Sequence, residues 1–284
     1  MNDISIECKD CNKIFILTIA EQEFLAERGI HQPRICRECI RHKKYEMQSD
    51  KLKEFVEEIK YINRNPLDNS VLSFLKDIDT NPQVVIKPND FLYRARIITN
   101  CNDINKEKNF LGYSKEGSFV PPIKMTKDMR ANYKYIPYLY CTDNLDIAIS
   151  EVRPRIGADV SIAKIMVNEN LRIFDFTISQ KPADISTSKI KLCEDLSEIF
   201  SSPIVNDEDT INYVPTQYIS EFIKNLGYDG IKYKSVNKSC EINGANFVIF
   251  NYPKCEPIKS NVITIKNVQL FYKKNDDDTV DIFN

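Results

Sequence analysis

Histidine is nearly absent from this sequence: its 284 residues include only two, His31 and His42, and both lie near the N-terminus. The remainder of the chain therefore cannot use an imidazole base to activate a nucleophile. Glycine is scarce as well, with seven residues and no GxGxxG motif, which excludes the phosphate-binding turn of a Rossmann domain. A recycled dinucleotide redox cofactor is therefore not expected.

Long apolar segments and a strong charge of either sign are missing too. No apolar run approaches the length that spans a bilayer, and the N-terminus MNDISIECKDC lacks the apolar segment of a signal peptide. The formal net charge is -2, so no global basic field favours nucleic acid. We therefore expect a cytoplasmic protein without a membrane partner. The length allows one large domain and a small module.

Cysteine, in contrast, is abundant: there are nine, and four of them form two CxxC pairs within residues 1–45. In a reducing compartment, an odd count with this spacing favours metal binding over disulfides. Two such pairs provide the tetrahedral sulfur site that suits structural Zn²⁺. The predicted ligands are Cys8, Cys11, Cys36 and Cys39. The alternatives are four free thiols or a redox CxxC pair, and either histidine can replace a cysteine as ligand.

The segment between the cysteine pairs, IFILTIAEQEFLAERGI, predicts a strand and a short helix that ends at Gly29. With the cysteine pairs, the module is similar to a small family of zinc ribbons through Phe15, Glu21, Gln22 and Phe24. A short basic patch follows at Arg41, Lys43 and Lys44. This patch can contact the phosphates of a nucleic acid, or it can be a solvated face.

Residues 46–84 form a predicted helical connector. Its first helix carries an apolar stripe of Leu52, Phe55, Val56, Ile59 and Ile62, and its second a stripe of Val71, Phe74, Leu75 and Ile78. Asn65-Pro66 and Asn81-Pro82 are expected to end these helices.

A third region, residues 85–284, opens with the alternating strand FLYRARII at residues 91–98. Alternation places Arg94 and Arg96 on one face of this strand. Two arginines on one face can bind a pyrophosphate through bidentate hydrogen bonds. The alternative is an exposed, amphipathic edge strand.

The stretch from Arg130 to Pro154 combines an arginine, several tyrosines and a glutamate in a strand followed by a helix. We expect Thr142 to cap this helix, whose apolar stripe is Leu145, Ala148, Ile149 and Val152. Glu151 borders the stripe, where desolvation can tune a carboxylate. By itself, the pattern favours a surface glutamate on an amphipathic helix.

Further along, residues 160–167 and 171–176 are expected to form a hairpin around residues 168–170. A helix containing Ile219 and Ile223 should stop at Gly227. Two strands follow, with Ser235 near the end of the first and Asn246 at the start of the second. A lone polar residue at a strand end is usually without function.

Taken in order, several motifs resemble the RES domain family in its longer form, over residues 88–252. They are FLYRAR with Arg94, Arg130 with Asn132, LYCTDN with Tyr140, AISEVRP with Glu151, YKS with Ser235, and the strand with Asn246. The chain departs from the family at RANYKYIPYLY, where short members have a glycine-rich turn. The resemblance implies an α+β fold similar to ADP-ribosyltransferases and an activity that consumes NAD. Short members are toxins neutralised by an Xre-type antitoxin, so an antitoxin or another regulatory protein is an implied partner.

The resemblance also gives the residues roles. The implied catalytic set is Glu151, Arg130, Tyr140 and Ser235, and the implied substrate-binding set is Arg94, Arg96, Asn132 and Asn246. A carboxylate stabilises the oxocarbenium-like state that forms when the nicotinamide–ribose bond breaks. The arginines can bind the pyrophosphate, Tyr140 can stack on the nicotinamide or ribose, and the remaining polar groups can bind ribose hydroxyls or the carboxamide.

Three functional hypotheses follow. The first is an NAD glycohydrolase or phosphorylase that depletes cellular NAD as a toxin or defence effector. The second is an ADP-ribosyltransferase that modifies a protein or nucleic acid. The third is a non-enzymatic adaptor whose zinc ribbon binds nucleic acid or protein. The oligomeric state is left open by the sequence.

Overall fold

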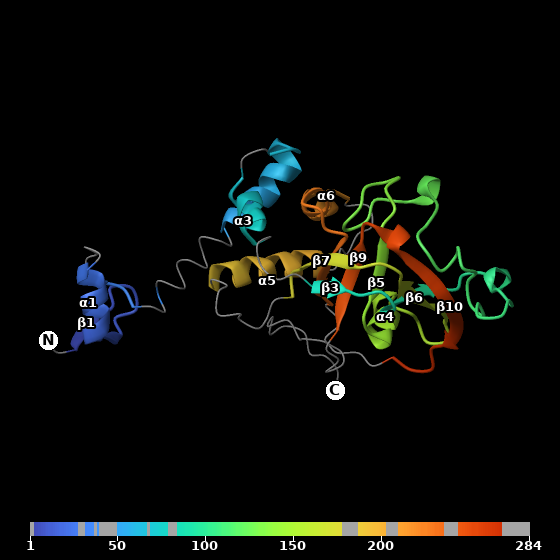
Figure 1. Cartoon of the computed structure of the whole chain (residues 1–284), viewed down its shortest axis with the longest axis horizontal. Helices are drawn as coiled ribbons and strands as arrows, with labels where there is room; N and C mark the ends of the chain where they lie inside the picture. The colour runs from blue at the N-terminus through green and yellow to red at the C-terminus, as the bar shows by residue number, and fades with distance from the viewer. Residues whose placement is uncertain are drawn as a thin grey trace, which may run out of the picture. The chain divides into compact units, whose positions relative to one another are not determined.

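A computed structural model covers the whole chain (Figure 1), and it describes residues 3–27, 32–36, 39, 50–66, 69–78, 84–177, 187–202, 210–235 and 244–268. The chain divides into two compact units. The first comprises Met1–Phe74 and Ser179–Asp195, and the second comprises Leu75–Ile178 and Leu196–Asn284. Arg41, Lys43, Lys44 and both histidines lie outside the described residues, as do Gly29 and Asn81-Pro82.

The N-terminal part of the first unit is a hairpin followed by a helix. Strands β1 (Ile4–Glu7) and β2 (Ile14–Leu17) pair antiparallel, and α1 (Ile19–Glu27) follows directly. Thr18 and Glu21 form a reciprocal cap at the start of α1: Thr18 N–H donates to Glu21 Oε2 at 3.0 Å, and Glu21 N–H donates to Thr18 Oγ1 at 3.4 Å. The strand and helix predicted between the cysteine pairs are confirmed.

Two helical segments follow. Residues 50–57 are α-helical and continue into η1 (Glu58–Ile62), after which α3 (Ser70–Ile78) begins. The first apolar stripe is buried at Leu52, Phe55 and Ile59, whereas Ile62 at the helix end is 83% exposed. Asn69 accepts a hydrogen bond from Val71 N–H at 2.8 Å and so caps α3.

The second unit is built on an eight-stranded sheet with the order β10-β6-β4-β5-β9-β8-β7-β3. The strands are β3 (Val84–Ile86), β4 (Phe91–Ile97), β5 (Leu139–Thr142), β6 (Asp159–Val167), β7 (Leu171–Asp175), β8 (Gly230–Lys234), β9 (Ala245–Ile249) and β10 (Cys255–Thr264). All neighbours are antiparallel except β7 and β8. One residue pair, Tyr93 with Thr142, joins β4 to β5. The sheet is therefore nearly divided into two halves at this point.

The predicted hairpin of residues 160–176 is wrong in its pairing. Both strands form, but β6 pairs with β4 and β10, and β7 pairs with β3 and β8. The short connection carries the chain from one half of the sheet to the other, and Asn168 N–H donates to Lys254 O at 2.8 Å. Both strands are largely buried, so packing of the two halves replaces the local pairing that the turn suggests.

The core of this unit unites the two halves of the sheet. One cluster of buried residues includes Leu92 and Ile165 from one half, and Leu139, Ile173 and Ile249 from the other. The predicted α+β class is confirmed by this mixture of sheet and flanking helices.

Helix α4 (Leu145–Glu151) packs against β4 and β5. The expected cap at Thr142 is wrong. Asn144 accepts hydrogen bonds from the backbone N–H groups of Asp146 and Ile147, because Thr142 is still part of β5 and its hydroxyl donates to Asn144 O at 2.6 Å. Leu145, expected on the apolar stripe, is 42% exposed, and Ile147 is buried instead.

Three more helices complete the described chain: α5 (Thr187–Ser201), η4 (Thr210–Tyr213) and α6 (Val214–Asn225), with short 3₁₀ turns at Cys101–Asp103, Ile123–Met125 and Tyr252–Lys254. Ile219 and Ile223 of α6 are buried, and Gly227 follows with φ +87°, as the sequence predicts. Every helix in the described ranges falls short of the length or the apolar character needed to traverse a bilayer.

Candidate functional site

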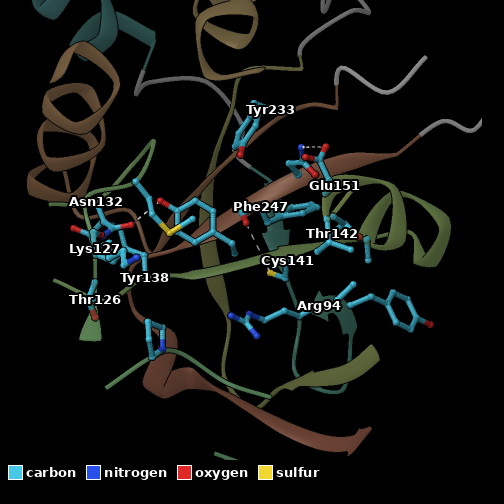
Figure 2. Close-up of a pocket in the computed structure, with 18 residues that line it drawn as sticks. Arg94, Thr126, Lys127, Asn132, Tyr138, Cys141, Thr142, Glu151, Tyr233 and Phe247 are labelled. Atoms are coloured by element: carbon cyan, nitrogen blue, oxygen red, sulfur yellow. Dashed lines mark hydrogen bonds between the residues drawn. The ribbon is translucent and has the colours of Figure 1, made fainter. Parts of the chain in front are cut away.

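A cavity of about 300 Å³ opens in the second unit where β4 and β5 meet (Figure 2). Strands β4, β5, β8 and β9, helix α4 and the segment between residues 121 and 138 all contribute to its wall. It lies next to the single residue pair that joins the two halves of the sheet. Because β4 and β5 pair at only this position, the space between them is left for the cavity. The predicted residues that line the cavity are Arg94, Asn132, Tyr140, Glu151 and Asn246.

Glu151, the last residue of α4, is fixed by two side chains, one from the residue that follows β8 and one from β9. Ser235 Oγ donates to Glu151 Oε1 at 2.6 Å, and Asn246 Nδ2 donates to the same oxygen at 2.7 Å. Hydrogen bonds to an ionised carboxylate are the stronger kind, so they hold the group in one orientation. Within the described residues, Oε2 accepts no hydrogen bond. The structure thus brings together three residues that lie far apart in the sequence.

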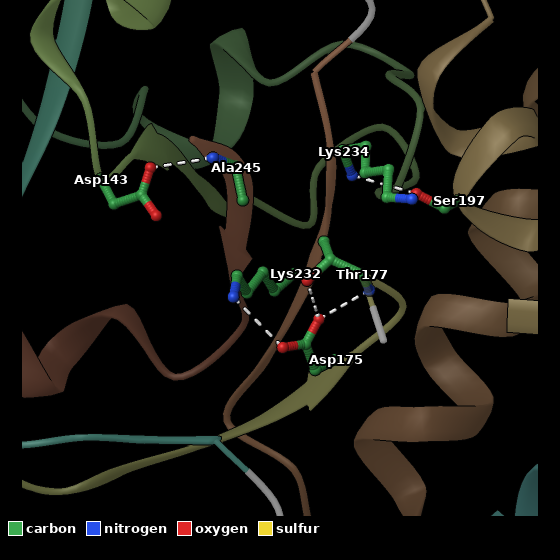
Figure 3. Close-up of polar contacts among 7 residues, drawn as sticks. All are labelled: Asp143, Asp175, Thr177, Ser197, Lys232, Lys234 and Ala245. Atoms are coloured by element: carbon green, nitrogen blue, oxygen red, sulfur yellow. Dashed lines mark hydrogen bonds and ion pairs between the residues drawn. The ribbon is translucent and has the colours of Figure 1, made fainter. Parts of the chain in front are cut away.

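The residue that precedes each of these two donors forms a hydrogen bond through its backbone N–H group (Figure 3). Lys234 N–H, next to Ser235, donates to Ser197 Oγ at 3.0 Å, and Ala245 N–H, next to Asn246, donates to Asp143 Oδ1 at 2.8 Å. On the neighbouring rung, Asp175 of β7 pairs with Lys232 of β8 at 3.2 Å. The ends of β8 and β9 that carry the donors are therefore anchored.

Arg94 supplies a buried cation to the same cavity. Burial, and then the neighbouring Arg96, lower the pKa of Arg94 to about 10, so it stays charged at neutral pH. Its Nη1 has no hydrogen-bond partner within the described residues. A buried charge without a partner is costly unless a ligand compensates it, so this end of the cavity has the chemistry to receive an anion.

Arg96 and Arg130 do not line the cavity. Arg96 is exposed, donates to Gly117 O and lies 4.5 Å from the Tyr113 ring. Arg130 donates from Nη1 to Ile199 O at 3.0 Å and from Nη2 to Ser202 O at 2.6 Å. Its guanidinium therefore caps the C-terminus of α5, where carbonyl groups lack helical partners.

Tyr140 and Asn132 form a hydrogen-bonded pair that holds the cavity wall. Tyr140 OH donates to Asn132 Oδ1 at 2.7 Å and accepts from Ala131 N–H at 3.0 Å. Asn132 Nδ2 is 3.0 Å from both Lys127 O and Tyr133 O. Burial raises the pKa of Tyr140, so its phenol remains protonated and does not serve as a base.

Polar residues on α6 that the sequence did not reveal support the same wall. Gln217 Nε2 donates to Met129 O and to Asn132 O, both at 2.9 Å, and Thr216 Oγ1 donates to Arg130 O at 2.5 Å. Both side chains are buried. Polar residues among the buried positions of an amphipathic helix were the signal that could have identified them.

Tyr233 is another lining residue that the motifs did not identify. It belongs to β8, two residues before Ser235, and is 6% exposed. Figure 2 shows its hydroxyl directed into the cavity. Burial raises the pKa of Tyr233, so the group offers a neutral hydroxyl. Among the described residues this hydroxyl has no hydrogen-bond partner.

The four predicted metal ligands come together in the first unit. The Sγ atoms of Cys8, Cys11, Cys36 and Cys39 lie within 4.8 Å of one another, and those of Cys11 and Cys36 are 3.7 Å apart. A tetrahedral zinc site with Zn–S bonds of about 2.3 Å places its sulfurs about 3.8 Å apart. Backbone N–H groups of Cys36 and Cys39 also approach Sγ of Cys8 and Cys36, at 3.2 and 3.4 Å. The donor set fits structural zinc, which would tie the hairpin to the second cysteine pair.

The fold and its two sites define a two-module α+β protein, with a four-cysteine module and a domain that holds a carboxylate at a cavity. A RES domain model matches residues 111–269, more than half of the chain, and the chain belongs to the RES domain family. A second model, described as a probable treble clef domain, matches residues 2–48. The resemblance to the long form with an N-terminal metal-type module is confirmed. Arg94 precedes the matched RES residues.

Among solved structures, the M. tuberculosis MbcT–MbcA toxin–antitoxin complex is matched with a TM-score of 0.38 and 13% identity. The match covers 70% of this chain and 94% of the other chain. No curated protein matches the sequence.

Proposed function

We propose that this protein cleaves the nicotinamide–ribose bond of NAD, releasing nicotinamide and ADP-ribose. The observation that carries the proposal is Glu151, whose carboxylate is held at the cavity by Ser235 and Asn246. The likeness of RES domains to ADP-ribosyltransferases supports the same reaction. NAD enters as the substrate, consistent with the absence of a Rossmann motif.

The chemistry needs a fixed negative charge beside the ribose. When the bond between C1′ and the nicotinamide nitrogen breaks, its electron pair leaves with nicotinamide and positive charge develops on C1′ and the ring oxygen. A carboxylate that is already oriented stabilises this charge without reorganisation. Water then attacks C1′ and releases a proton, which balances the reaction. Oε2 of Glu151, which accepts no hydrogen bond from the described residues, is the oxygen suited to face C1′ or the incoming water.

The other end of the cavity suits the remainder of NAD. Arg94 is a buried cation, and its Nη1 is without a partner in the described chain. A pyrophosphate would provide the missing counter-charge through charge-assisted hydrogen bonds. We therefore assign the pyrophosphate to Arg94 and leave Arg96 and Arg130 outside the contacts with the substrate.

The acceptor that fits best is water. Glu151 is exposed to solvent at the cavity mouth, so a small acceptor reaches it without a recognition surface. Phosphate as acceptor would give ADP-ribose 1″-phosphate, and a macromolecular acceptor would give an ADP-ribosylated product. Sustained hydrolysis would deplete cellular NAD, which is the basis for proposing a toxin or defence effector restrained by an antitoxin or other protein.

The test is to incubate zinc-loaded full-length protein with NAD, with and without phosphate, and to separate the products by chromatography. We expect nicotinamide and ADP-ribose in equal amounts. Glu151→Gln should lower kcat by about a thousandfold, as expected for loss of a transition-state charge interaction. The matched control is Glu169→Gln, an exposed glutamate in the turn between β6 and β7. No turnover by the wild type, or full turnover by Glu151→Gln, overturns the proposal.

A cell-based experiment addresses the biological role. Inducing the wild-type gene should lower cellular NAD and stop growth, whereas inducing Glu151→Gln at equal protein levels should do neither. Growth arrest that is unchanged by Glu151→Gln would separate toxicity from NAD cleavage and remove the toxin assignment.

A further inference from the structure

Helix α5 places two serine hydroxyls against the backbone of Lys234. Ser197 Oγ accepts from Lys234 N–H at 3.0 Å. Ser201 Oγ lies 2.6 Å from Lys234 O and 2.5 Å from Ser197 O, so its single proton is shared between two carbonyl groups. The two serines are four residues apart and therefore lie on one face of the helix. Ser197 is only 2% exposed.

These hydroxyls provide hydrogen-bond partners to Lys234 at the edge of β8 where β7 no longer pairs with it. Within the described residues, the pairing of β7 with β8 stops at Asp175 and Lys232, and Phe176 N–H makes the last backbone hydrogen bond between these segments, to Lys232 O at 2.8 Å. On the opposite edge, β9 continues to pair as far as Lys234 with Ala245. Without Ser197, the Lys234 N–H group would be left partly buried without a partner at the end of β8. Side chains of helix α5 thus take over from β7 as the hydrogen-bond partners of the last residue of β8.

The residue that follows is Ser235, which donates to Glu151. We infer that Ser197 and Ser201 are positioning residues: they fix the end of β8, so that the Ser235 hydroxyl holds the Glu151 carboxylate in its productive orientation. The inference rests on the proposed function and extends it to helix α5. It predicts an effect on the chemical step, because a carboxylate that is free to rotate loses preorganisation without losing the contacts that bind substrate.

The inference also gives Arg130 a role outside the cavity. Its two bonds, to Ile199 O and Ser202 O, hold the turn of α5 that carries Ser201. Arg130 O in turn accepts from Thr216 of α6. The arginine therefore stabilises the helix end that clamps Lys234, in place of the contact with NAD that the family motif suggested.

The first experiment compares Ser197→Ala with Ser202→Ala. The control is matched, because Ser202 directly follows α5 and, among the described residues, its hydroxyl donates to Glu198 O of that helix, at 2.8 Å. We expect Ser197→Ala to lower kcat for NAD cleavage about tenfold, with KM changed by less than about twofold. Ser202→Ala should keep wild-type values for both constants. An unchanged kcat for Ser197→Ala overturns the inference.

The second experiment asks whether Ser197 acts through Ser235. In a Ser235→Ala background, adding Ser197→Ala should cost less than about twofold in kcat, because the group that it positions is already gone. A further tenfold loss in the double variant would show a general structural effect and overturn the inference. Equal melting temperatures of the two single variants ensure that the comparison concerns folded protein.

A readout without catalysis separates this inference from the proposed function. Residue-resolved amide exchange should be about tenfold faster at Lys234 in Ser197→Ala than in the wild type, and unchanged in Ser202→Ala. If the wild type does not cleave NAD, the proposed function fails, and accelerated exchange at Lys234 still supports the clamp. Unchanged exchange overturns the clamp whether or not the wild type is active.

Discussion

The four-cysteine module and the cavity of the RES domain are two polar sites made in opposite ways. The candidate metal ligands come from two short CxxC motifs in one N-terminal stretch. The cavity collects Arg94, Glu151 and Asn246, with Ser235 bonded to Glu151, from positions spread over more than half of the chain. In the first case a bound zinc ion would hold the fold together; in the second a large fold positions the side chains of the site without one.

The difference concerns where the stabilising free energy comes from. Among the described residues of the module few apolar side chains are buried, Leu17 being one, so zinc binding would supply much of its folding free energy. The cavity is backed by a core of side chains from both halves of the sheet. Removing zinc should therefore unfold the four-cysteine module, whereas the domain that holds the cavity should keep its fold without a bound substrate.

Zinc removal is the prediction with the largest expected effect. A strong chelator should abolish the fold of residues 3–27, because structural zinc contributes about 10 kcal/mol or more to such modules. NAD turnover should stay within about twofold, since the residues around the cavity all belong to the second unit. Amide exchange of the two regions, measured with zinc content and kcat on the same sample, checks both statements.

Two results would break the comparison. Protected amides in β1 and β2 after complete loss of zinc would show that the module folds on its own core. A loss of turnover that zinc restores would show that the two regions are coupled. The control is Cys101→Ser, which removes an exposed cysteine outside the cluster. The same response to the chelator in this variant would show that oxidation of an exposed thiol does not cause the effect.

Arg94→Gln is expected to have the next largest effect. It removes the buried cation and should raise KM for NAD about 10- to 100-fold, the range expected for lost hydrogen bonds to a charged group. The matched control is Arg96→Gln, two residues along the same strand, whose guanidinium bonds to Gly117 O outside the cavity. Steady-state kinetics over a wide NAD range measures both variants.

The reverse pattern, a raised KM in Arg96→Gln and a normal one in Arg94→Gln, would restore the pyrophosphate contact to the exposed arginine. Equal effects would support the arrangement predicted from strand alternation, in which both arginines bind one pyrophosphate.

Comparing the two sites also shows what a sequence can reveal. The cysteine pairs were predictable because the two cysteines of each pair are only three residues apart in the chain. Glu151 was identified through the ordered family motifs, since its helix pattern alone fitted an ordinary surface residue. Its two hydrogen bonds, from residues 84 and 95 positions away, depend on strand order. The crossing of the chain between β6 and β7 shows how poorly local turns specify that order.

Arg130 illustrates the limit of a motif that is read without its environment. The sequence shows a cation near the catalytic residues, which suggests a phosphate ligand. Only the tertiary structure shows that carbonyl groups at the end of α5 already occupy the guanidinium. Ser197 and Gln217 were missed for a related reason, because a polar residue on the buried face of a helix has no partner visible in the sequence.

Tyr233→Phe should have a moderate effect. The substitution keeps the ring that packs 5.5 Å from Phe200 and removes only the hydroxyl directed into the cavity. If this hydroxyl binds NAD, its loss should raise KM about fivefold, the equivalent of one neutral hydrogen bond. The control is Tyr135→Phe, since Tyr135 is 53% exposed and lies outside the cavity wall. An unchanged KM in Tyr233→Phe would show that the Tyr233 hydroxyl does not contribute to NAD binding.

The smallest effect on catalysis is expected for Tyr140→Phe. The phenol bonds to Asn132 Oδ1 and Ala131 N–H, so its loss should reduce the free energy of unfolding by about 1–3 kcal/mol by leaving both groups without this partner. Because the ring remains, kcat should fall less than about threefold. Urea unfolding and NAD kinetics on one preparation separate the two effects. A fall in kcat of more than tenfold at unchanged stability would contradict this assignment, because the hydroxyl would then act on the substrate and the cavity wall would not depend on it.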